Sequence, residues 1–451
     1  MRILIIGTGY VGLNTGVMLA YLGHDVTCID VNAEKIKLLQ AGLVPFYEPN
    51  LENLFKTVGP RMRFTSDYDD AGIPEADVVF IAVGTPSLPD GSANLEYVRQ
   101  AAESVAERMG EGFTVVVNKS TVPIGSGNWV GAILKDQYER SHGKKPNGHY
   151  AVVSNPEFLK QGAALHDSFY PDRIVIGSED EKGAEKLKEL YKHLILQDFE
   201  APEGLPRPEG MGSVPVLVCD LSSAEVIKYA ANAFLALKIS FINEVGHLAQ
   251  KVGGDVTAIA RGIGLDKRIG PAFLEAGIGW GGSCFGKDTA ALVSTAHEYK
   301  LEMPIIQAAR DVNYNQRAWV VDTLQETLKI LKGRRIAMLG FSFKPDTDDL
   351  RDAPSLDISR LLLLRGALVR VHDPIALDNA RRQYADLGVT FCQDVEDALD
   401  EAEAIVLVTH WPYYRELDWE KINPVPVLDG RNYLDRGRLE RLGFRVIGVG
   451  R

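Results

Sequence analysis

Apolar runs and polar turns alternate in a regular order along the first third of the chain. Residues 2–6 predict a buried strand, residues 10–22 predict an apolar helix that stops at Gly23, and residues 26–29 predict a second strand. Further strands, each followed by a polar loop, are expected at 77–83, 114–118 and 151–154. Strands that alternate with helices are typical of a parallel sheet covered by helices on both faces.

A long segment with helical spacing of its apolar residues follows at 220–252. At ~1.5 Å per residue it predicts a helix of about 45 Å, long enough to span domains or line a subunit interface. Ser222 and Glu225, three residues apart, predict a capping box at its start. Lys228 and Asn232, four residues apart, are expected to share one face of the helix.

The last third of the chain repeats the pattern of the first. A strand is expected at 335–339, a helix is expected to begin at Pro354, and a second strand is expected at 369–372. The run at 401–408 also resembles the run at 75–82. This part of the chain therefore predicts a second, similar α/β domain.

The fold class expected is α/β, with two Rossmann-like doubly wound domains joined by a central region built on the long helix. Domain boundaries are predicted at 1–200, 216–325 and 330–451. The intervening segment 201–215 is rich in Pro, Gly and Glu and predicts a linker or an exposed loop.

The turn after the first strand carries a glycine pattern that predicts dinucleotide binding. Gly7 allows the tight turn, Gly9 lets a pyrophosphate approach the backbone, and Gly12 permits close packing of helix on strand. Asp30, at the end of the second strand, would accept hydrogen bonds from a ribose and repel a 2′-phosphate, which favours NAD over NADP. The first turn of the C-terminal domain lacks the second and third glycines, so that domain is expected to bind another ligand.

Composition narrows the possible partners. The chain has 451 residues, 45% of them hydrophobic and 24% charged, as in ordinary globular proteins. Its net charge of −12 argues against nucleic acid or an anionic membrane as a partner, because both need a basic surface. No run approaches the ~20 apolar residues of a membrane span, and the run at 2–6 is too short for a signal peptide. The four cysteines lack metal-ligand spacing, so we expect no metal site and a reducing, cytoplasmic location.

Cys284 is the cysteine whose surroundings predict chemistry. It lies among glycines, and Lys287 and Asp288 follow it closely. A nearby cation lowers the pKa of a thiol and enriches the nucleophilic thiolate. Together with a hydride acceptor, such a thiol predicts an oxidation that passes through a carbon–sulfur intermediate. The other three cysteines are expected to be small buried hydrophobic residues, at positions 28, 219 and 392.

The chain resembles the UDP-glucose/GDP-mannose dehydrogenase family over nearly its whole length. The resemblance rests on the motifs GTGYVG at Gly7, KSTVP at Lys119, NPEFL at Asn155, SAEVIKYAANAFLALKISFINE at Ser223, RIG at Arg268, GWGGSCFGKD at Gly279, FKPDTDDLRDAP at Phe343 and DGRN at Asp429. It implies an NAD-binding Rossmann domain, a central helical domain that forms a homodimer, and a C-terminal UDP-binding domain. It also implies that UDP-glucose is oxidised at carbon 6 to UDP-glucuronate while two NAD⁺ are reduced.

A thiol is what such a four-electron oxidation needs. An aldehyde has no hydride to give until a nucleophile adds to it. Cys284 can add to form a thiohemiacetal, and loss of a second hydride then leaves a thioester that water hydrolyses.

The resemblance also implies roles for five other residues. Lys228 and Asn232 hold the oxygen on carbon 6, as an oxyanion site does. Asp288 acts as a base or orients water in the alcohol step, Glu157 assists thioester hydrolysis, and Thr121 hydrogen-bonds the catalytic water. The division of base roles among Asp288, Lys228 and Glu157 is left open.

The remaining ligand contacts are likewise implied by the resemblance. Cofactor contacts are expected at Gly7, Gly9, Tyr10, Val11, Gly12, Asp30, Lys35, Thr85, Thr121, Lys287 and Arg351. Substrate contacts are expected at Glu157, Phe158, Leu159, Lys228, Asn232, Arg268, Phe273, Gly277, Gly281, Phe343, Lys344 and Arg431. Arg268 is expected to reach the active site of the neighbouring subunit. One departure is Gln161, where the family commonly has an acid, so the role of this position is in doubt.

Three alternatives follow from the same residues. A sister enzyme would act on GDP-mannose or on a UDP-N-acetylhexosamine. A two-domain hydroxyacid dehydrogenase would transfer one hydride and need no thiol. A non-catalytic nucleotide-binding module would be expected to have lost Cys284, Lys228 or Asp288, and all three are present.

Overall fold

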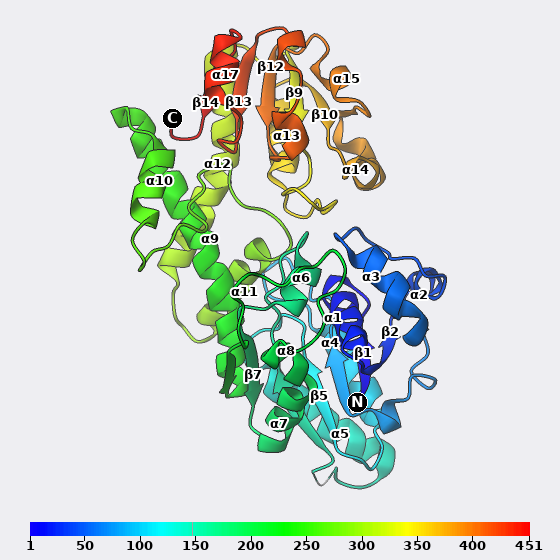
Figure 1. The fold of residues 1–451 in the computed structure, drawn as a ribbon. Coiled ribbons are helices and arrows are strands. Elements are labelled where there is room, and N and C mark those ends of the chain that lie inside the picture. The colour runs from blue at the N-terminus through cyan, green and yellow to red at the C-terminus, as the bar shows by residue number, and fades with distance from the viewer. Residues whose placement is uncertain (147) are drawn as a thin grey trace. The chain divides into compact units, whose positions relative to one another are not determined.

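The chain folds into two compact units, each built around one sheet. The computed structural model describes residues 1–146 and 148–451, and the units are Met1–Ala230 and Ala231–Arg451. The first unit contains an eight-stranded sheet and the second a six-stranded sheet (Figure 1).

The first sheet has the strand order β3-β2-β1-β4-β5-β6-β7-β8. All neighbouring strands are parallel except β6 and β7, which are antiparallel. The strands are β1 (Arg2–Ile6), β2 (Asp25–Ile29), β3 (Arg63–Thr65), β4 (Val78–Ile81), β5 (Thr114–Asn118), β6 (Tyr150–Ser154), β7 (Ile174–Ser178) and β8 (Val216–Cys219). Its first six strands follow the doubly wound Rossmann order, which confirms the predicted fold class for this unit.

The helices of the first unit bury both faces of this sheet. They are α1 (Tyr10–Tyr21), α2 (Ala33–Gln40), α3 (Leu51–Val58), α4 (Glu96–Arg108), α5 (Ser126–His142), α6 (Ala164–Phe169), α7 (Glu181–Leu190) and α8 (Lys192–Leu196). Successive side chains of β1 point to opposite faces, so Ile3 and Ile5 belong to one apolar core and Leu4 and Ile6 to another. This double burial explains why the strands read as unbroken apolar runs.

Helix α9 (Leu221–Val252) is the predicted long helix, and it begins in the first unit and ends in the second. Its 32 residues correspond to about 48 Å. The predicted capping box is wrong. Asp220 accepts hydrogen bonds from the backbone N–H and hydroxyl of Ser223 at 2.7 and 2.6 Å, so it is the capping residue. Glu225 instead accepts from the backbone N–H groups of Gly125 and Gly127, at the start of α5.

The segment 201–215 is not a simple exposed linker. Leu205 and Val214 are buried in the core of the first unit, and the Leu205 carbonyl accepts a hydrogen bond from Tyr170 at 2.8 Å. The segment leads into β8, which is the edge strand of the first sheet. Because an edge strand is covered on fewer sides, Cys219 is only half-buried, contrary to the prediction, whereas Cys28 and Cys392 are buried as expected.

The second sheet repeats the order of the first six strands, as β11-β10-β9-β12-β13-β14, with all neighbours parallel. The strands are β9 (Arg335–Leu339), β10 (Leu368–His372), β11 (Thr390–Phe391), β12 (Ala404–Leu407), β13 (Pro426–Asp429) and β14 (Arg445–Gly448). The helices of the unit are α10 (Val256–Gly264), α11 (Phe285–Glu298), α12 (Pro304–Leu328), α13 (Pro354–Leu364), α14 (Leu377–Gln383), α15 (Val395–Leu399), α16 (Pro412–Arg415) and α17 (Arg436–Arg441). The predicted second Rossmann-like domain is thereby confirmed.

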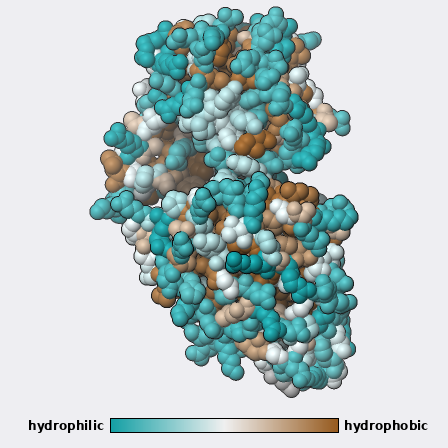
Figure 2. Space-filling model, turned by 45° about the vertical axis from the view of Figure 1, so that its right-hand side comes forward, coloured by the Kyte–Doolittle hydropathy of each residue, from teal (hydrophilic) through white to brown (hydrophobic). Residues whose placement is uncertain are grey.

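Hydrophilic residues cover most of the face shown in Figure 2, and hydrophobic residues gather there in smaller patches. Within residues 1–146 and 148–451, none of the helices is both long and apolar enough to cross a membrane.

Candidate active site

The glycine turn after β1 has the geometry of a dinucleotide cradle. Gly7 has a φ of +100°, and a Cβ there would come within 2.6 Å of the Ala82 carbonyl oxygen. A Cβ on Gly12 would overlap the Gly7 carbonyl oxygen. A Cβ on Gly9 would meet no described atom within 4 Å, so the turn is open on that side. The start of α1 carries no side-chain cap among the described residues, which leaves its N–H groups for a phosphate.

Asp30 lies at the end of β2 as an ionised acceptor. Its carboxylate accepts hydrogen bonds from the N–H and hydroxyl of Thr8 at 2.9 and 2.7 Å and from the Asn32 N–H at 2.9 Å. Lys35 lies 3.6 Å from the same carboxylate. Burial alone would raise the pKa of Asp30, but these hydrogen bonds and the Lys35 charge lower it. The glycine turn after β1 and the carboxylate of Asp30 together fit NAD.

Tyr10 is half-buried, and its hydroxyl belongs to a hydrogen-bond network with Glu48. The tyrosine hydroxyl donates to the Glu48 carboxylate, which also accepts from the N–H groups of Gly162 and Ala164 at 2.8 and 2.7 Å. Burial, followed by the charge of Glu48, raises the pKa of Tyr10. The network therefore ties the glycine turn to the segment that follows Glu157.

Two threonines connect the loops after β4 and β5. The Thr85 hydroxyl donates to the Thr121 carbonyl at 2.8 Å. Because these strands are neighbours in the sheet, both loops lie at its carboxyl edge, where ligands of doubly wound folds bind.

Lys228 and Glu157 form a buried ion pair. Lys228 Nζ lies 2.9 Å from Glu157 Oε1, and the two side chains are only 4% and 5% exposed. The Leu159 N–H donates to the other carboxylate oxygen at 2.6 Å. Burial alone would raise the pKa of Glu157, but the charge and hydrogen bond of Lys228 and the Leu159 N–H lower it. Glu157 is therefore held as a carboxylate that is paired with the Lys228 ammonium.

The ring of Phe158, next to this ion pair, lies close to two cations. The Arg173 guanidinium lies 3.6 Å from the Phe158 ring centroid, and Lys228 Nζ lies 5.4 Å from it. These contacts fix the Phe158 side chain, which leaves the backbone of the loop to meet a ligand.

In the second unit, Asn232 and Asp288 form a similar buried pair. Asn232 Nδ2 donates to Asp288 Oδ2 at 2.6 Å, and Lys287 Nζ lies 2.8 Å from Asp288 Oδ1. Asp288 is fully buried. Its N–H donates to the Cys284 carbonyl at 2.8 Å, so Cys284 and Asp288 lie on the first turn of α11.

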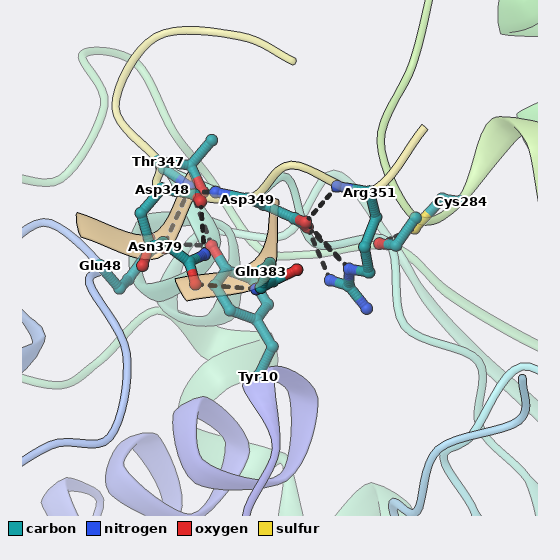
Figure 3. A network of polar contacts seen from close by, with 11 residues as sticks. Tyr10, Glu48, Cys284, Thr347, Asp348, Asp349, Arg351, Asn379 and Gln383 are labelled. Carbon is teal, nitrogen blue, oxygen red and sulfur yellow. Dashed lines mark hydrogen bonds and ion pairs between the residues drawn. The ribbon is translucent and has the colours of Figure 1, made fainter. Parts of the chain in front are cut away.

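The thiol of Cys284 lies at the N-terminus of the 14-residue helix α11, where the helix dipole stabilises an anion. Figure 3 shows the side chain of Arg351 next to Cys284. Asp349 holds the guanidinium of Arg351 through contacts of 2.9, 3.0 and 2.6 Å. Burial alone would lower the pKa of Arg351, but Asp349 and the negative charge of Cys284 raise it. The N-terminus of α11 and the guanidinium of Arg351 thus both provide positive potential at the thiol.

Glycines let neighbouring segments pack tightly around the thiol. Gly282 has a φ of +86°, and a Cβ there would come within 2.7 Å of the Phe343 ring. A Cβ on Gly281 would overlap the carbonyl oxygen of Asp352. Any other residue would force a shift of the Phe343 ring at position 282 or of the Asp352 backbone at position 281.

Positive charge also gathers at the carboxyl edge of the second sheet. Arg431 follows β13 and donates to the carbonyls of Val408 and Gly279 at 2.7 and 3.0 Å. Burial, followed by the charge of Arg317, lowers the pKa of Arg431 to about 10. Burial and the charges of Arg431 and Lys344 lower the pKa of His410 to about 4. An edge of this kind attracts an anion.

The structure thus groups many of the expected residues, but not all of them. Two expected substrate contacts of the second unit are held by the backbone of their segment: Phe273 has a left-handed φ of +65°, and the Gly277 N–H donates to the Asn243 side chain at 2.8 Å. The Arg268 side chain is 89% exposed and pairs with Asp266 in its own loop. His410 was missed by sequence reasoning, although a histidine three residues after an apolar strand is the signal that could have found it.

Comparison with known proteins matches one family along the chain. Residues 1–195 match the NAD-binding domain of the UDP-glucose/GDP-mannose dehydrogenase family, residues 222–315 its central domain, and residues 337–436 its UDP-binding domain. A UDP-glucose 6-dehydrogenase of Bacillus subtilis is 42% identical over 457 aligned residues, which cover 100% of this chain and 98% of that protein.

Two solved structures share the fold. A UDP-glucose dehydrogenase from the archaeon Pyrobaculum islandicum has a TM-score of 0.87 and 40% identity, with 99% of this chain and 96% of that chain covered. A UDP-D-ManNAc dehydrogenase from Pyrococcus horikoshii has a TM-score of 0.84 and 27% identity, with 100% and 99% covered.

Proposed function

Because the chain belongs to the UDP-glucose/GDP-mannose dehydrogenase family and is an NAD-dependent dehydrogenase, we propose that it oxidises carbon 6 of UDP-glucose to the carboxylate of UDP-glucuronate. The observation that carries the choice of substrate is the 42% identity, over the full chain, to a UDP-glucose 6-dehydrogenase. The similarity to the enzyme acting on UDP-D-ManNAc is lower, at 27%.

The first unit supplies the cofactor site. When bound there, NAD⁺ would supply the hydride acceptor, with one NAD⁺ reduced in each of the two oxidations and NADH exchanged for NAD⁺ between them. The open face at Gly9 and the N–H groups at the start of α1 would hold its pyrophosphate, and Asp30 would hold its ribose hydroxyls. Lys35, paired with Asp30, supports the orientation of that carboxylate.

The alcohol step uses donors that are already oriented. Lys228 and Asn232 lie one turn apart on α9, and each is held by a carboxylate, Glu157 or Asp288. Both would donate hydrogen bonds to the oxygen on carbon 6 as it loses its proton and gains negative charge. Asp288 takes up the proton, and the product of this step is an aldehyde.

The acid step uses Cys284. Its sulfur bonds to the aldehyde carbon to give a thiohemiacetal, and loss of a hydride and a proton leaves a thioester. Glu157 then takes a proton from water, the water oxygen bonds to the thioester carbon, and the carbon–sulfur bond breaks to release the thiolate. The support for this sequence is the position of Cys284 at a helix N-terminus beside Arg351, and the lowered pKa of Glu157, which keeps that group in the carboxylate form that can accept a proton.

The second unit would hold the nucleotide. Lys344 and Arg431 provide positive charge at the carboxyl edge of its sheet, which suits a diphosphate. Gly277 and Gly281 let the backbone pack against the carbonyl oxygens of Gly430 and Asp352, which fixes the segments that would border this site.

We also assign a homodimer to this chain, formed through α9. Phe234, Phe241 and Leu248 are 60%, 50% and 64% exposed, and their seven-residue spacing places them on one face of the helix. A second copy would cover this apolar stripe and bring the exposed Arg268 to the neighbouring active site. Light scattering should show a dimer that Phe241→Glu dissociates, and a monomeric wild-type protein would contradict the assignment.

A nucleotide-sugar screen with NADH stoichiometry tests the proposed reaction. We expect two NADH per UDP-glucose and much slower turnover of GDP-mannose and of UDP-N-acetylhexosamines. Faster turnover of UDP-N-acetylmannosamine would favour the second candidate, which the fold similarity to the Pyrococcus horikoshii enzyme supports. One NADH per sugar would instead exclude both candidates.

A further inference from the structure

Lys119 and Asn155 join the two loops that carry Thr121 and Glu157. Lys119 directly follows β5 and Asn155 directly follows β6, which are neighbouring parallel strands. Lys119 Nζ donates to Asn155 Oδ1 at 2.9 Å. Thr121 lies two residues after Lys119, and Glu157 lies two residues after Asn155. A displacement of this one contact would therefore move both loops.

The Asn155 amide is held at both ends. Its oxygen also accepts a hydrogen bond from the Tyr191 hydroxyl at 2.8 Å, and its nitrogen donates to the Val175 carbonyl at 2.7 Å. Asn155 is 1% exposed. An amide fixed in this way transmits the position of Lys119 to the backbone of the loop that follows.

Lys119 also places a second positive charge near Glu157. Lys119 is half-buried, and its Nζ contacts Asn155 and lies 5.9 Å from the centroid of the Tyr191 ring. The charge of Glu157 favours the ammonium, while that of Lys228 opposes it. With burial as the largest effect, the pKa of Lys119 falls to about 8. In turn, the Lys119 charge helps to keep Glu157 ionised.

We propose that Lys119 is a positioning residue for thioester hydrolysis, one that fixes the Glu157 loop against the Thr121 loop and keeps Glu157 as a carboxylate able to take a proton from water. This inference rests on the role proposed above for Glu157. Lys119 acts through Asn155 and Glu157 and takes no part in either hydride transfer.

Rapid-mixing and steady-state measurements of NADH on the full-length enzyme test this role. In Lys119→Met we expect the two NADH formed before hydrolysis to appear at the normal rate, while kcat falls roughly 10- to 100-fold. The KM for UDP-glucose should stay within about threefold, because Asn155 keeps its hydrogen bonds to Tyr191 and Val175, which still hold the loop that would contact the substrate. Without the second cation the pKa of Glu157 rises, so the acidic limb of the kcat–pH profile should move to higher pH.

Two further variants separate charge from hydrogen bonding. Tyr191→Phe is the matched control, because it removes a donor to the same Asn155 oxygen without changing charge. It should leave the acidic limb where it is in the wild type. Lys119→Arg keeps the charge and should also leave the limb in place. If Lys119→Met does not fold, as judged by circular dichroism, Lys119→Gln removes the same charge with a polar side chain and carries the same expectations.

Each outcome bears on one proposal or the other. If the charge-removing variant slows the two hydride transfers as much as kcat, or leaves the acidic limb unmoved, the role assigned to Lys119 is wrong. Glu157→Gln should accumulate a covalent adduct on Cys284, which mass spectrometry detects. Normal turnover of Glu157→Gln would overturn the proposed role of Glu157 and with it that of Lys119. Adduct accumulation in Glu157→Gln but not in Lys119→Met would overturn the inference about Lys119 alone.

Discussion

Replacing Lys228 with Met should destabilise the protein in a pH-dependent way. The substitution keeps the length of the side chain but removes the ammonium that lies 2.9 Å from Glu157 Oε1. Glu157 would then be a buried carboxylate with the Leu159 N–H and the more distant Lys119 as its remaining partners. Removing one member of a buried ion pair leaves an uncompensated charge, which is far costlier than removing both.

The size of the effect follows from the burial of the pair. Breaking a buried ion pair typically costs about 3–5 kcal/mol, and the positive charge of Lys119 places the expected loss near the lower value, about 3 kcal/mol at pH 8. For a unit of this size that corresponds to a fall in Tm of roughly 6–12 °C.

The sign of the pH dependence can also be worked out. In the wild type the pKa of Glu157 is lowered, so its stabilisation is present above the unfolded-state pKa and is lost as the pH falls through the folded-state pKa. In the variant, burial dominates and raises the pKa of Glu157, so the ionised form is penalised at neutral pH. The penalty should shrink as the pH falls through that raised value and vanish below the unfolded-state pKa, roughly 4.3.

Denaturant unfolding of the full chain at several pH values measures the free energy of unfolding and so checks this reasoning. The matched control is the double variant Lys228→Met/Glu157→Gln. The double variant removes both charges, and a neutral Gln can still accept from the Leu159 N–H, so its stability should return to within about 1 kcal/mol of the wild type. Its activity should be lost, as in the single variant, because both groups take part in the proposed reaction. A single variant as stable as the wild type at pH 8, or a double variant no more stable than the single one, would refute the account of this pair.

Three further predictions use other parts of the chain. Cys284→Ala should still bind NAD and UDP-glucose by calorimetry but form no UDP-glucuronate, and normal two-step turnover would contradict the covalent mechanism. Gly12→Ala should weaken NAD binding by more than about tenfold, because its Cβ would overlap the Gly7 carbonyl oxygen. Isothermal titration measures the affinity, and an unchanged affinity would contradict this account of the packing. Asp220→Ala should lower stability by about 1 kcal/mol and Ser222→Ala by much less in denaturant unfolding, and equal losses would contradict the assignment of Asp220 as the cap.

The strands could be predicted where burial on both faces makes them unbroken apolar runs. The predicted bounds 114–118 and 335–339 agree with β5 and β9 at both ends. Strand β8 was missed because it is an edge strand whose Leu217 and Val218 are exposed, so it carries little of the buried pattern. Apolar spacing reports burial, and edge strands are the least buried members of a sheet.

Long-range polar partners were beyond prediction for a different reason. The spacing of Ser222 and Glu225 fits a capping box, but Glu225 is used by backbone N–H groups about 100 residues earlier in the chain. The pairing of Lys228 with Glu157 likewise spans 71 positions. Local spacing identifies which residues share a helix face, as it did for Lys228 and Asn232, but only the fold determines which acids meet them.

The two turns of α9 that carry Lys228 and Asn232 share one physical arrangement. In each, a buried donor on the helix is held by a carboxylate from another segment, Glu157 in one case and Asp288 in the other. A buried donor is tolerated only if it has a partner, so the carboxylates stabilise the resting protein as well as orienting the donors. In the proposed reaction, an incoming oxygen that develops negative charge would compete with these carboxylates for the same N–H groups, and it would do so best when its charge is greatest. The arrangement would therefore favour the alkoxide-like transition state over the neutral alcohol, which is the difference that accelerates a reaction.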